Sequence, residues 1–510
     1  MNSKFMLKIT SALLAIVMML AVFASCAETA GGENDTTANA ATEMPSATDD
    51  ITMPEETVVG DDVPELNFGG EDIVILGRNR DWCADEIVVS DENGTVVNDA
   101  VFKRNMLVRE RLGIELVFQG VGATNSTDNY AVRDALRKFI ESGAEDVDLV
   151  ANAAYVSAST QAEGLYHNLT DIENLDLSKP DWSQGLNTAM EVGGAQYLCS
   201  GAIFLSYYRF IFVTFFNVDT FANAGIEPLY DTVEKGEWTL EKQFVLAEQL
   251  YRDNNGNGET DAGDFFGFMG NHDMIGVDGY WASFELPILT KDEDGYYKYA
   301  LDLERTSKAV ELINDFFWNN KGVMRVNYKS GDTEQDEIAQ RFANEEAAMV
   351  TLRLIECEND LLGMSNYGIV PLPKLDQNQQ LNRAAIHDSF TVYSIPNFSF
   401  SNDELAMIGA VLEVMASQSF KTITPAYYEQ ALKGRYANDP QSVAMLDQIT
   451  QNVWIEAGIL NCNAIEAPHK TFRDAIKNRY PNASSIFSQK AKITQRKVND
   501  LNASLEKLLG

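Results

Sequence analysis

Three short apolar runs, IVIL (73–76), IELVF (114–118) and VDLV (147–150), decide the fold of this chain. Runs of four or five residues rich in Ile, Val and Leu are typical of strands that are buried on both faces. Each gap between them is long enough to hold a helix that crosses over a sheet.

The gaps carry helix signals of their own. Asn98 or Asp99 supplies an N-cap for a helix that continues to about Leu112, and Gly113 ends it. A second helix covers about residues 130–142. The order strand, helix, strand, helix, strand predicts a doubly wound α/β lobe with a parallel sheet.

The N-terminus has the pattern of an export signal. Two lysines precede the apolar stretch ITSALLAIVMMLAVF (9–23), which is too short for a spanning helix. The small residues and cysteine that follow resemble a bacterial lipobox, so we expect a signal peptide (1–25) and acylation of Cys26. Phe23 stands where the lipobox usually has Leu, and a plain signal peptide with an incidental cysteine is the alternative.

Residues 26–65 are expected to form a disordered, acidic tether after the lipidated cysteine. They are rich in Ala, Thr, Glu, Asp and Gly, and no Lys or Arg occurs between Lys8 and Arg78. Such a composition cannot bury enough apolar surface to offset the entropy of ordering. The net charge of −37 for the whole chain argues against nucleic acid as a partner, since phosphate contacts need Lys and Arg. It also disfavours direct binding to anionic membranes, which leaves the lipid as the membrane anchor.

The sequence offers little support for catalysis. Only four histidines occur, and zinc-protease, nucleophile-elbow, Walker A and dinucleotide-binding motifs are missing from the sequence. His387, Asp388 and Ser389 are consecutive, and on a strand their side chains would alternate between faces, which is not the geometry of a triad. Beyond Cys26 the cysteines are widely spaced, so we expect buried thiols, with disulfides as the alternative. These are Cys83, Cys199, Cys357 and Cys462.

Several longer segments resemble, in the right order, elements of the extracellular solute-binding proteins that include maltose-binding protein. The segments are DVDLVANAAYVSASTQAEGLYHNLTDI (146–172), FFNVDTFANAGIEP (215–228), GEWTLEKQFVLAEQL (236–250), RFANEEAAMV (341–350), GIVPLPK (368–374) and YYEQALKGRYANDPQSVAMLDQI (427–449). The resemblance runs from about residue 66 to the C-terminus. In the fourth segment Glu345 and Glu346 replace the usual Gly-Lys.

The resemblance implies a two-lobed, periplasmic-binding-protein-like α/β fold. Each lobe would be a mainly parallel sheet flanked by helices and discontinuous in sequence. The N-terminal lobe would hold residues 66–203 and 380–418, and the C-terminal lobe residues 204–379 and 419–510. The implied function is capture of a small polar ligand, a carbohydrate first of all, for the permease subunits of an ABC importer. The alternatives are an oligopeptide or other non-sugar ligand, a sensor lipoprotein without a transporter, and a surface-anchored hydrolase.

Candidate ligand contacts follow from sheet topology and from sugar chemistry. Ligands in such sheets lie beyond the carboxyl ends of the strands, which points to residues 77–82 and 151–155. Sugar sites combine aromatic faces with Asp, Asn, Arg and Trp N–H groups. The candidates are Arg78, Asp81, Trp82, Asn152 and Tyr155 on the first lobe, Asn271, His272, Asp273 and Trp281 on the second, and Trp454 after the C-terminal helical element.

The segment DNNGNGETDAGD (253–264) has the spacing of a calcium-binding loop. Its ligand oxygens would come from Asp253, Asn255, Asn257, the Glu259 carbonyl, Asp261 and Asp264. Gly258 stands where the loop needs a sharp turn, and Asp264 replaces the usual bidentate Glu. We therefore expect a structural Ca²⁺ site, with an Asn/Gly-rich polar turn as the alternative.

Overall fold

The computed structural model describes residues 60–124, 128–273, 275–327, 333–364, 366–428 and 440–509. The expected signal peptide, Cys26 and most of the tether (26–65) lie outside the described residues. The middle of the 427–449 element lies outside them too.

The first lobe is built on a four-stranded sheet with the order β11-β3-β1-β2. Its strands are β1 (Glu71–Arg78), β2 (Ile114–Val121), β3 (Leu149–Ala153) and β11 (Thr391–Ser394). β2 and β3 both pair with β1 in parallel, as the three apolar runs predict, and β11 pairs with β3 in the antiparallel direction.

Helices cover both faces of this sheet because its side chains alternate. Ile73 and Ile75 of β1 pack with α3 (Val96–Leu112) and α14 (Asn402–Ala426). Leu76 packs on the opposite face with α4 (Ala131–Ser142). Gly113 ends α3 with a φ of 63°, in the left-handed region that the sequence required of it.

The second lobe is built on a five-stranded sheet with the order β10-β4-β9-β5-β8. Its strands are β4 (Phe212–Asn217), β5 (Phe268–Asn271), β8 (Val323–Val326), β9 (Met349–Arg353) and β10 (Tyr367–Val370). The mainly parallel arrangement expected of each lobe describes the first sheet. The second is mixed: β5 pairs in parallel with β8 and β9, while β4 is antiparallel to β9 and β10. β4 is the first strand of this lobe in chain order, and it runs opposite to β9 and β10, the later strands that pair with it.

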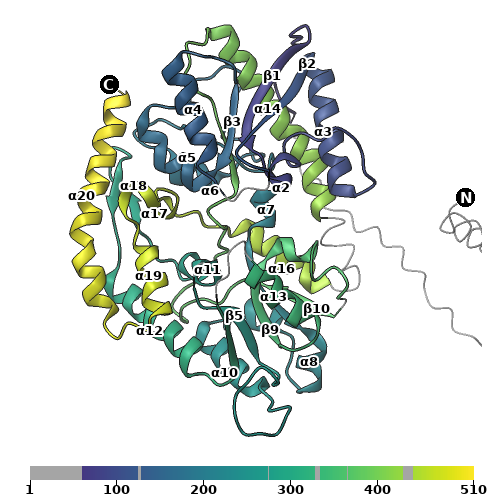
Figure 1. Cartoon of the computed structure of the whole chain (residues 1–510), viewed down its shortest axis with the longest axis vertical. Helices are drawn as coiled ribbons and strands as arrows, with labels where there is room; N and C mark the ends of the chain where they lie inside the picture. Colours follow the sequence, from purple (N-terminus) through teal and green to yellow (C-terminus); the bar gives the residue numbers. More distant parts are fainter. Residues whose placement is uncertain are drawn as a thin grey trace, which may run out of the picture. The chain divides into compact units, whose positions relative to one another are not determined.

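The remaining elements surround the two sheets (Figure 1). Helices of the first lobe are α2 (Asp81–Ala84), α5 (Ala154–Thr160), η1 (Gln161–Glu163) and α6 (Gln184–Met190). Those of the second are α7 (Ser206–Arg209), α8 (Val218–Asn223), α9 (Leu229–Glu234), α10 (Leu240–Leu250), α11 (Ile275–Ser283), α12 (Leu303–Asn319), α13 (Thr333–Ala343), η2 (Leu354–Cys357) and α16 (Pro440–Gln451). A hairpin is formed by β6 (Leu289–Lys291) and β7 (Tyr297–Tyr299), and α17 (Ala457–Leu460), α18 (Cys462–Ile465), α19 (Pro468–Lys477) and α20 (Ala483–Leu509) close the chain.

Three chain segments cross between the two sheets side by side. These crossing segments are residues 208–212, 384–388 and 452–455. The His387 backbone N–H donates to the Phe210 carbonyl at 3.0 Å, and the Trp454 N–H donates to the Ala384 carbonyl at 2.9 Å. The connection between the lobes is therefore a small hydrogen-bonded ladder rather than a single strand.

The C-terminal segment, residues 457–509, contacts elements of both lobes. α17 and α18 pack on α5 of the first lobe, while α20 packs along α12 of the second and reaches η1 of the first. Figure 1 shows α20, in yellow, running along one edge beside these elements. The β6–β7 hairpin adds to this bridge, because the Tyr297 hydroxyl donates to the Ala189 carbonyl at 3.0 Å.

The four cysteines in the described residues are free and buried, as expected, and form no disulfide with one another. Within the same residues, no helix combines the length and apolar character needed to cross a membrane.

Two glycines let α10 lie directly on the second sheet. A Cβ built on Gly322 would stand 1.9 Å from the Ala247 carbonyl oxygen, and one on Gly267 would stand 2.0 Å from the same atom. A methyl group at either position must push the helix off the sheet. We predict that Gly322→Ala destabilises the protein by about 1–3 kcal/mol, as overpacking does.

Thermal unfolding followed by circular dichroism measures this effect. Gly363→Ala is the matched control, since nothing lies within 4 Å of its Cβ position. Equal melting temperatures for the two variants would contradict the close approach of α10.

Candidate functional site

A small enclosed cavity lies beside the crossing segments. Its wall is formed by Asp278, Trp281, Ala282, Ala385, Ile386, His387, Asp388, Trp454, Ile455, Glu456, Ile459, Leu460 and His469. These residues come from α11, two crossing segments, α17 and α19, which lie between the two sheets in Figure 1. As it stands the cavity has room for about one water molecule, so a larger ligand requires its walls to separate.

Two buried polar side chains in this wall lack a partner among the described residues. The indole Nε1 of Trp281, which is 0 % exposed, makes no hydrogen bond, and neither do the two ring nitrogens of His469. A buried donor without an acceptor costs about 1–3 kcal/mol. The wall is therefore prepared for a ligand or water that supplies hydrogen-bonding atoms.

Three carboxyl groups line the same cavity. Asp278 is held by Arg473, whose Nε donates to Oδ1 at 2.5 Å. Burial raises the pKa of Asp388 to about 6 and that of Glu456 to about 7. The Glu456 carboxyl also accepts three backbone N–H groups, from Ile288, Leu289 and Ile459, so it fixes the cavity wall as well as lining it.

The predicted contacts of the first lobe are divided between several environments. Arg78 is 4 % exposed. It donates to the Ser389 carbonyl at 3.1 Å and to Thr391 Oγ1 at 2.7 Å, so it ties β1 to β11 and to the turn before β11. Asn152 is fully buried within β3. Tyr155 is half-buried, and its hydroxyl accepts a hydrogen bond from Asn129 at 3.4 Å.

Asp81 and Trp82 line a different, open groove between α2, α3 and η2. The guanidinium carbons of Arg78 and Arg80 each lie 5.0 Å from the centre of the Trp82 ring, and Phe210 contacts it edge-on at 4.9 Å. Because these groups already occupy the ring of Trp82, it is a poorer sugar platform than its position in the sequence suggests.

The predicted contacts of the second lobe also separate. Trp281 and Trp454 both line the enclosed cavity. Asn271 ends β5, His272 and Asp273 follow it, and all three lie outside the cavity wall. His272 meets Trp318 edge-on at 5.2 Å, and Asp273 pairs with Lys477 at 2.5 Å. The structure thus brings two of the ten candidates into the cavity and two into the groove.

Sequence reasoning missed most of the polar wall. Asp278, Glu456 and His469 have no local pattern that marks them, since their partners lie far along the chain. His387, Asp388 and Ser389 occupy a turn, so the strand assumed for them is wrong. The conclusion that they form no triad still holds, because Ser389 Oγ (2.6 Å) and Asp388 Oδ1 (3.7 Å) both approach the same Nδ1 of His387.

The calcium-like loop (253–264) folds around its own oxygens. Asp253 accepts the backbone N–H groups of Gly256 and Gly258 at 2.6 and 2.9 Å. The Asp261 carboxylate accepts the side-chain amides of Asn255 and Asn257, and the Gly263 N–H lowers its pKa. Thr239 caps the preceding helix α10.

One further oxygen of the loop is left over. Asp264 Oδ1 is buried and has no partner among the described residues, while its Oδ2 accepts the Tyr251 hydroxyl at 2.6 Å. The donor set of carboxylates and amide oxygens therefore fits a hard cation such as Ca²⁺.

Comparison with known proteins identifies the architecture. No protein-family model and no curated protein sequence matches the chain. Among solved structures, it is similar to the galacto-N-biose/lacto-N-biose I-binding protein of a Bifidobacterium longum ABC transporter, in complex with lacto-N-biose. The TM-score is 0.55 and the identity 13 %, over 87 % of this chain and 98 % of that one.

The chain has the fold of ABC-transporter solute-binding proteins. A solute-binding protein from Thermotoga lettingae bound with α-D-tagatose gives a TM-score of 0.52 at 15 % identity, over 85 % of this chain and 100 % of that one. UgpB from Mycobacterium tuberculosis, in complex with glycerophosphocholine, gives a TM-score of 0.51 at 14 % identity, over 87 % of this chain and 100 % of that one. The two-lobed fold expected from the sequence is confirmed.

The raised pKa of Glu456 predicts a pH dependence of stability. The ordinary pKa is 4.5 and the folded value is about 7, so between these values the unfolded chain ionises while the folded chain stays protonated. Within this window rising pH therefore lowers the free energy of unfolding, by up to about 1.4 kcal/mol per pH unit. We predict that the melting temperature of the wild type, relative to Glu456→Gln, falls as pH rises from about 4.5 to 7.

Melting temperatures of both proteins across this range provide the measurement. Glu293→Gln, at an exposed position in the β6–β7 turn, is the control. A constant difference between the wild type and Glu456→Gln would show that Glu456 titrates normally.

Proposed function

We propose that this protein captures a small polar ligand, a carbohydrate, outside the cell for an ABC import system. The fold supports this proposal, since the solved proteins of like architecture include binders of lacto-N-biose and of α-D-tagatose. The observation that carries it is the cavity beside the crossing segments, where two tryptophans, one with an unpartnered N–H, meet three carboxyl groups and the unpartnered ring of His469.

The chemistry of the cavity suits a sugar. Trp281 and Trp454 offer aromatic surface to the C–H face of a pyranose ring, and carboxyl oxygens such as those of Asp388 accept hydrogen bonds from its hydroxyls. The Trp281 N–H and the His469 ring are positioned to bond the same hydroxyls. We infer binding without turnover, in keeping with the solved proteins of like fold, which are solute-binding proteins.

Binding would work by a shift between open and closed forms. Trp281 belongs to α11 of the second lobe, whereas His387 and Asp388 adjoin the first-lobe sheet through β11. A ligand that touches both walls favours the closed form by its extra contacts there. The crossing segments are the place where the backbone would bend, and the closed form would dock on the permease.

The N-terminal sequence supports attachment to the outer face of the cell membrane. Acylated Cys26 would provide the anchor, and the acidic segment from there to about residue 60 would hold the two lobes off the surface. The last residues of the tether expected up to residue 65 are instead bound to the first lobe, where Val63 is buried and its carbonyl accepts from Arg111 at 2.6 Å. The membrane would then be contacted through the lipid alone.

A non-sugar ligand is the main alternative, because UgpB shares the fold and its complex holds glycerophosphocholine.

Incubation with labelled oligosaccharides separates binding from hydrolysis, and unchanged oligosaccharide after long incubation is the expected result.

We also propose that the loop 253–264 binds one structural Ca²⁺. On binding, Asn255 and Asn257 would turn toward the ion their amide oxygens rather than the N–H groups that face Asp261, and buried Asp264 Oδ1 would gain a partner. The ion would pin the connection between α10 and β5.

A thermal-shift screen tests the carbohydrate proposal. Soluble protein starting at residue 60 is screened against mono- and oligosaccharides, peptides and amino acids. We expect stabilisation by a saccharide, with compaction in small-angle scattering. Trp281→Phe removes the unpartnered N–H and should lower the affinity for this saccharide about tenfold, which corresponds to about 1.4 kcal/mol of binding free energy.

Trp182→Phe is the matched control, since Trp182 is buried at the opposite face of the first lobe, against Glu413 of α14. If only peptides or amino acids stabilise the protein, the ligand is one of these and not a carbohydrate. If both variants lose the same affinity for the ligand, Trp281 is not part of the binding site.

If the loop binds calcium, adding Ca²⁺ to chelator-treated protein should increase its stability. Ca²⁺ at about 100 times its Kd should stabilise chelator-treated wild type by about 2.7 kcal/mol if unfolding is two-state. Asp253→Asn and Asp261→Asn should lose most of the response. Asp292→Asn, which changes a hairpin carboxylate that also accepts backbone N–H groups, should keep it. An unchanged melting temperature of the wild type would refute the calcium proposal.

A further inference from the structure

Three side chains of the types that bind transition metals converge at one corner of the enclosed cavity. Asp388 comes from a crossing segment, Cys462 from α18 and His469 from α19. Their carboxylate oxygen, sulfur and ring nitrogen all lie within 4.8 Å of one another. These residues are 74 and 7 positions apart in sequence, so only the tertiary fold assembles the group.

Two of the three groups are deeply buried, and one of them has no partner. Cys462 is 3 % exposed and His469 is 2 % exposed. Neither ring nitrogen of His469 has a hydrogen-bond partner among the described residues. The Cys462 sulfur is approached by Lys470, and Asp388 lies beside His387. A cation bound between the three side chains would supply the missing partner of His469.

The donor types select the metal. Thiolate sulfur and imidazole nitrogen suit Zn²⁺, while Ca²⁺ and Mg²⁺ take oxygen ligands. Three protein ligands leave the fourth tetrahedral position open. Asp388 and His469 line the cavity, which has room for about one water molecule, so that position is available to solvent.

The surrounding charges are compatible with a divalent cation. The nearest basic groups are Arg473 and Lys470, and both have partners. Arg473 is paired with Asp278, and the Lys470 ammonium donates to Asn463 Oδ1 at 2.8 Å as well as approaching the Cys462 sulfur. Asp278 and Glu456 place two further carboxyl groups in the wall of the same cavity.

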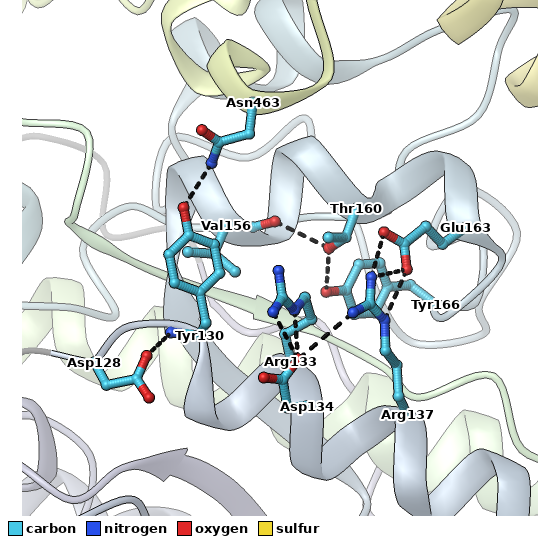
Figure 2. A network of polar contacts seen from close by, with 10 residues as sticks. All are labelled: Asp128, Tyr130, Arg133, Asp134, Arg137, Val156, Thr160, Glu163, Tyr166 and Asn463. Carbon is cyan, nitrogen blue, oxygen red and sulfur yellow. Dashed lines mark hydrogen bonds and ion pairs between the residues drawn. The ribbon is translucent and has the colours of Figure 1, made fainter.

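The residues beside Cys462 are held rigidly on the first lobe. Gln161 Nε2 donates to Asn461 Oδ1 at 3.1 Å, and Asn463 Nδ2 donates to the Tyr130 hydroxyl at 2.9 Å. Figure 2 shows Tyr130 at the start of α4 reaching toward Asn463, above the ion pairs of the same helix. Because a metal site depends on the positions of its supporting residues, this attachment fixes the sulfur relative to the cavity.

We propose that the protein binds one Zn²⁺ ion through Asp388, Cys462 and His469, with the fourth position open to the enclosed cavity. Binding displaces the Cys462 proton to solvent and leaves a thiolate on the metal. Asp388 and His469 also belong to the wall of the proposed sugar cavity, but the metal titration contains no sugar, so the two proposals fail separately.

The experiment uses the soluble chain from residue 60, freed of any affinity tag and of metal. It is titrated with Co²⁺ as a spectroscopic probe and with Zn²⁺ by calorimetry. We expect one ion per chain, a thiolate-to-cobalt charge-transfer band, and visible bands with the intensity of a tetrahedral site. Calorimetry in buffers of different ionisation enthalpy should show release of about one proton at neutral pH.

Cys462→Ala should abolish the charge-transfer band, and His469→Gln should weaken Zn²⁺ by at least about 100-fold. Cys83→Ala, which removes another buried thiol, should behave as the wild type does. Asp388→Asn provides a third test at a surface-adjacent turn, should either buried variant fail to fold. Absence of a one-to-one metal complex in the wild type, or the same cobalt spectrum in Cys462→Ala, would overturn the proposal.

Discussion

The backbone hydrogen bonds between the three crossing segments are the constraint on which the rest of the structure depends. They join Phe210 to His387 and Ala384 to Trp454, so that two return connections and the entry to β4 run as one ladder. Each sheet could form from its own residues, yet their mutual placement requires this ladder. The ladder also presents His387, Asp388 and Trp454 to the cavity, so the geometry of the site is inherited from the connection between the lobes.

A second level of organisation comes from the C-terminal segment. α17 and α18 rest on α5 of the first lobe, and α20 lies along α12 of the second. This segment supplies Ile459, Leu460 and His469, and Glu456 directly precedes it; these residues line one side of the cavity. A two-lobed fold that is open on that side would expose the tryptophans to solvent. Here the last fifty residues convert a cleft beside the ladder into an enclosed space.

Burial explains the electrostatic character of that space. In a chain with a net charge of −37, the carboxyl groups of Asp388 and Glu456 are drawn toward their neutral forms, because water is excluded around them. A neutral carboxyl group can donate as well as accept, which suits hydroxyl-rich ligands. The same exclusion of water makes His469 and Cys462 costly to leave unpartnered. The two proposals, carbohydrate capture and metal binding, therefore draw on one physical property of the cavity and share Asp388 and His469.

The sequence by itself determined strands β1 to β3 and the end of α3, because these signals are local. The apolar runs fixed the strands and Gly113 ended the helix, whereas the N-cap of α3 is Thr95 rather than the predicted Asn98 or Asp99. The sequence also placed the calcium-like loop, whose spacing lies within twelve residues. The candidate site could be predicted only in part: Trp281 and Trp454 reach the cavity, whereas Trp82 is engaged by Arg78, Arg80 and Phe210. Asp278, Asp388 and His469 had no pattern to mark them. Tertiary structure alone decided their meeting, because long-range contacts between segments up to two hundred residues apart leave no periodicity in the chain.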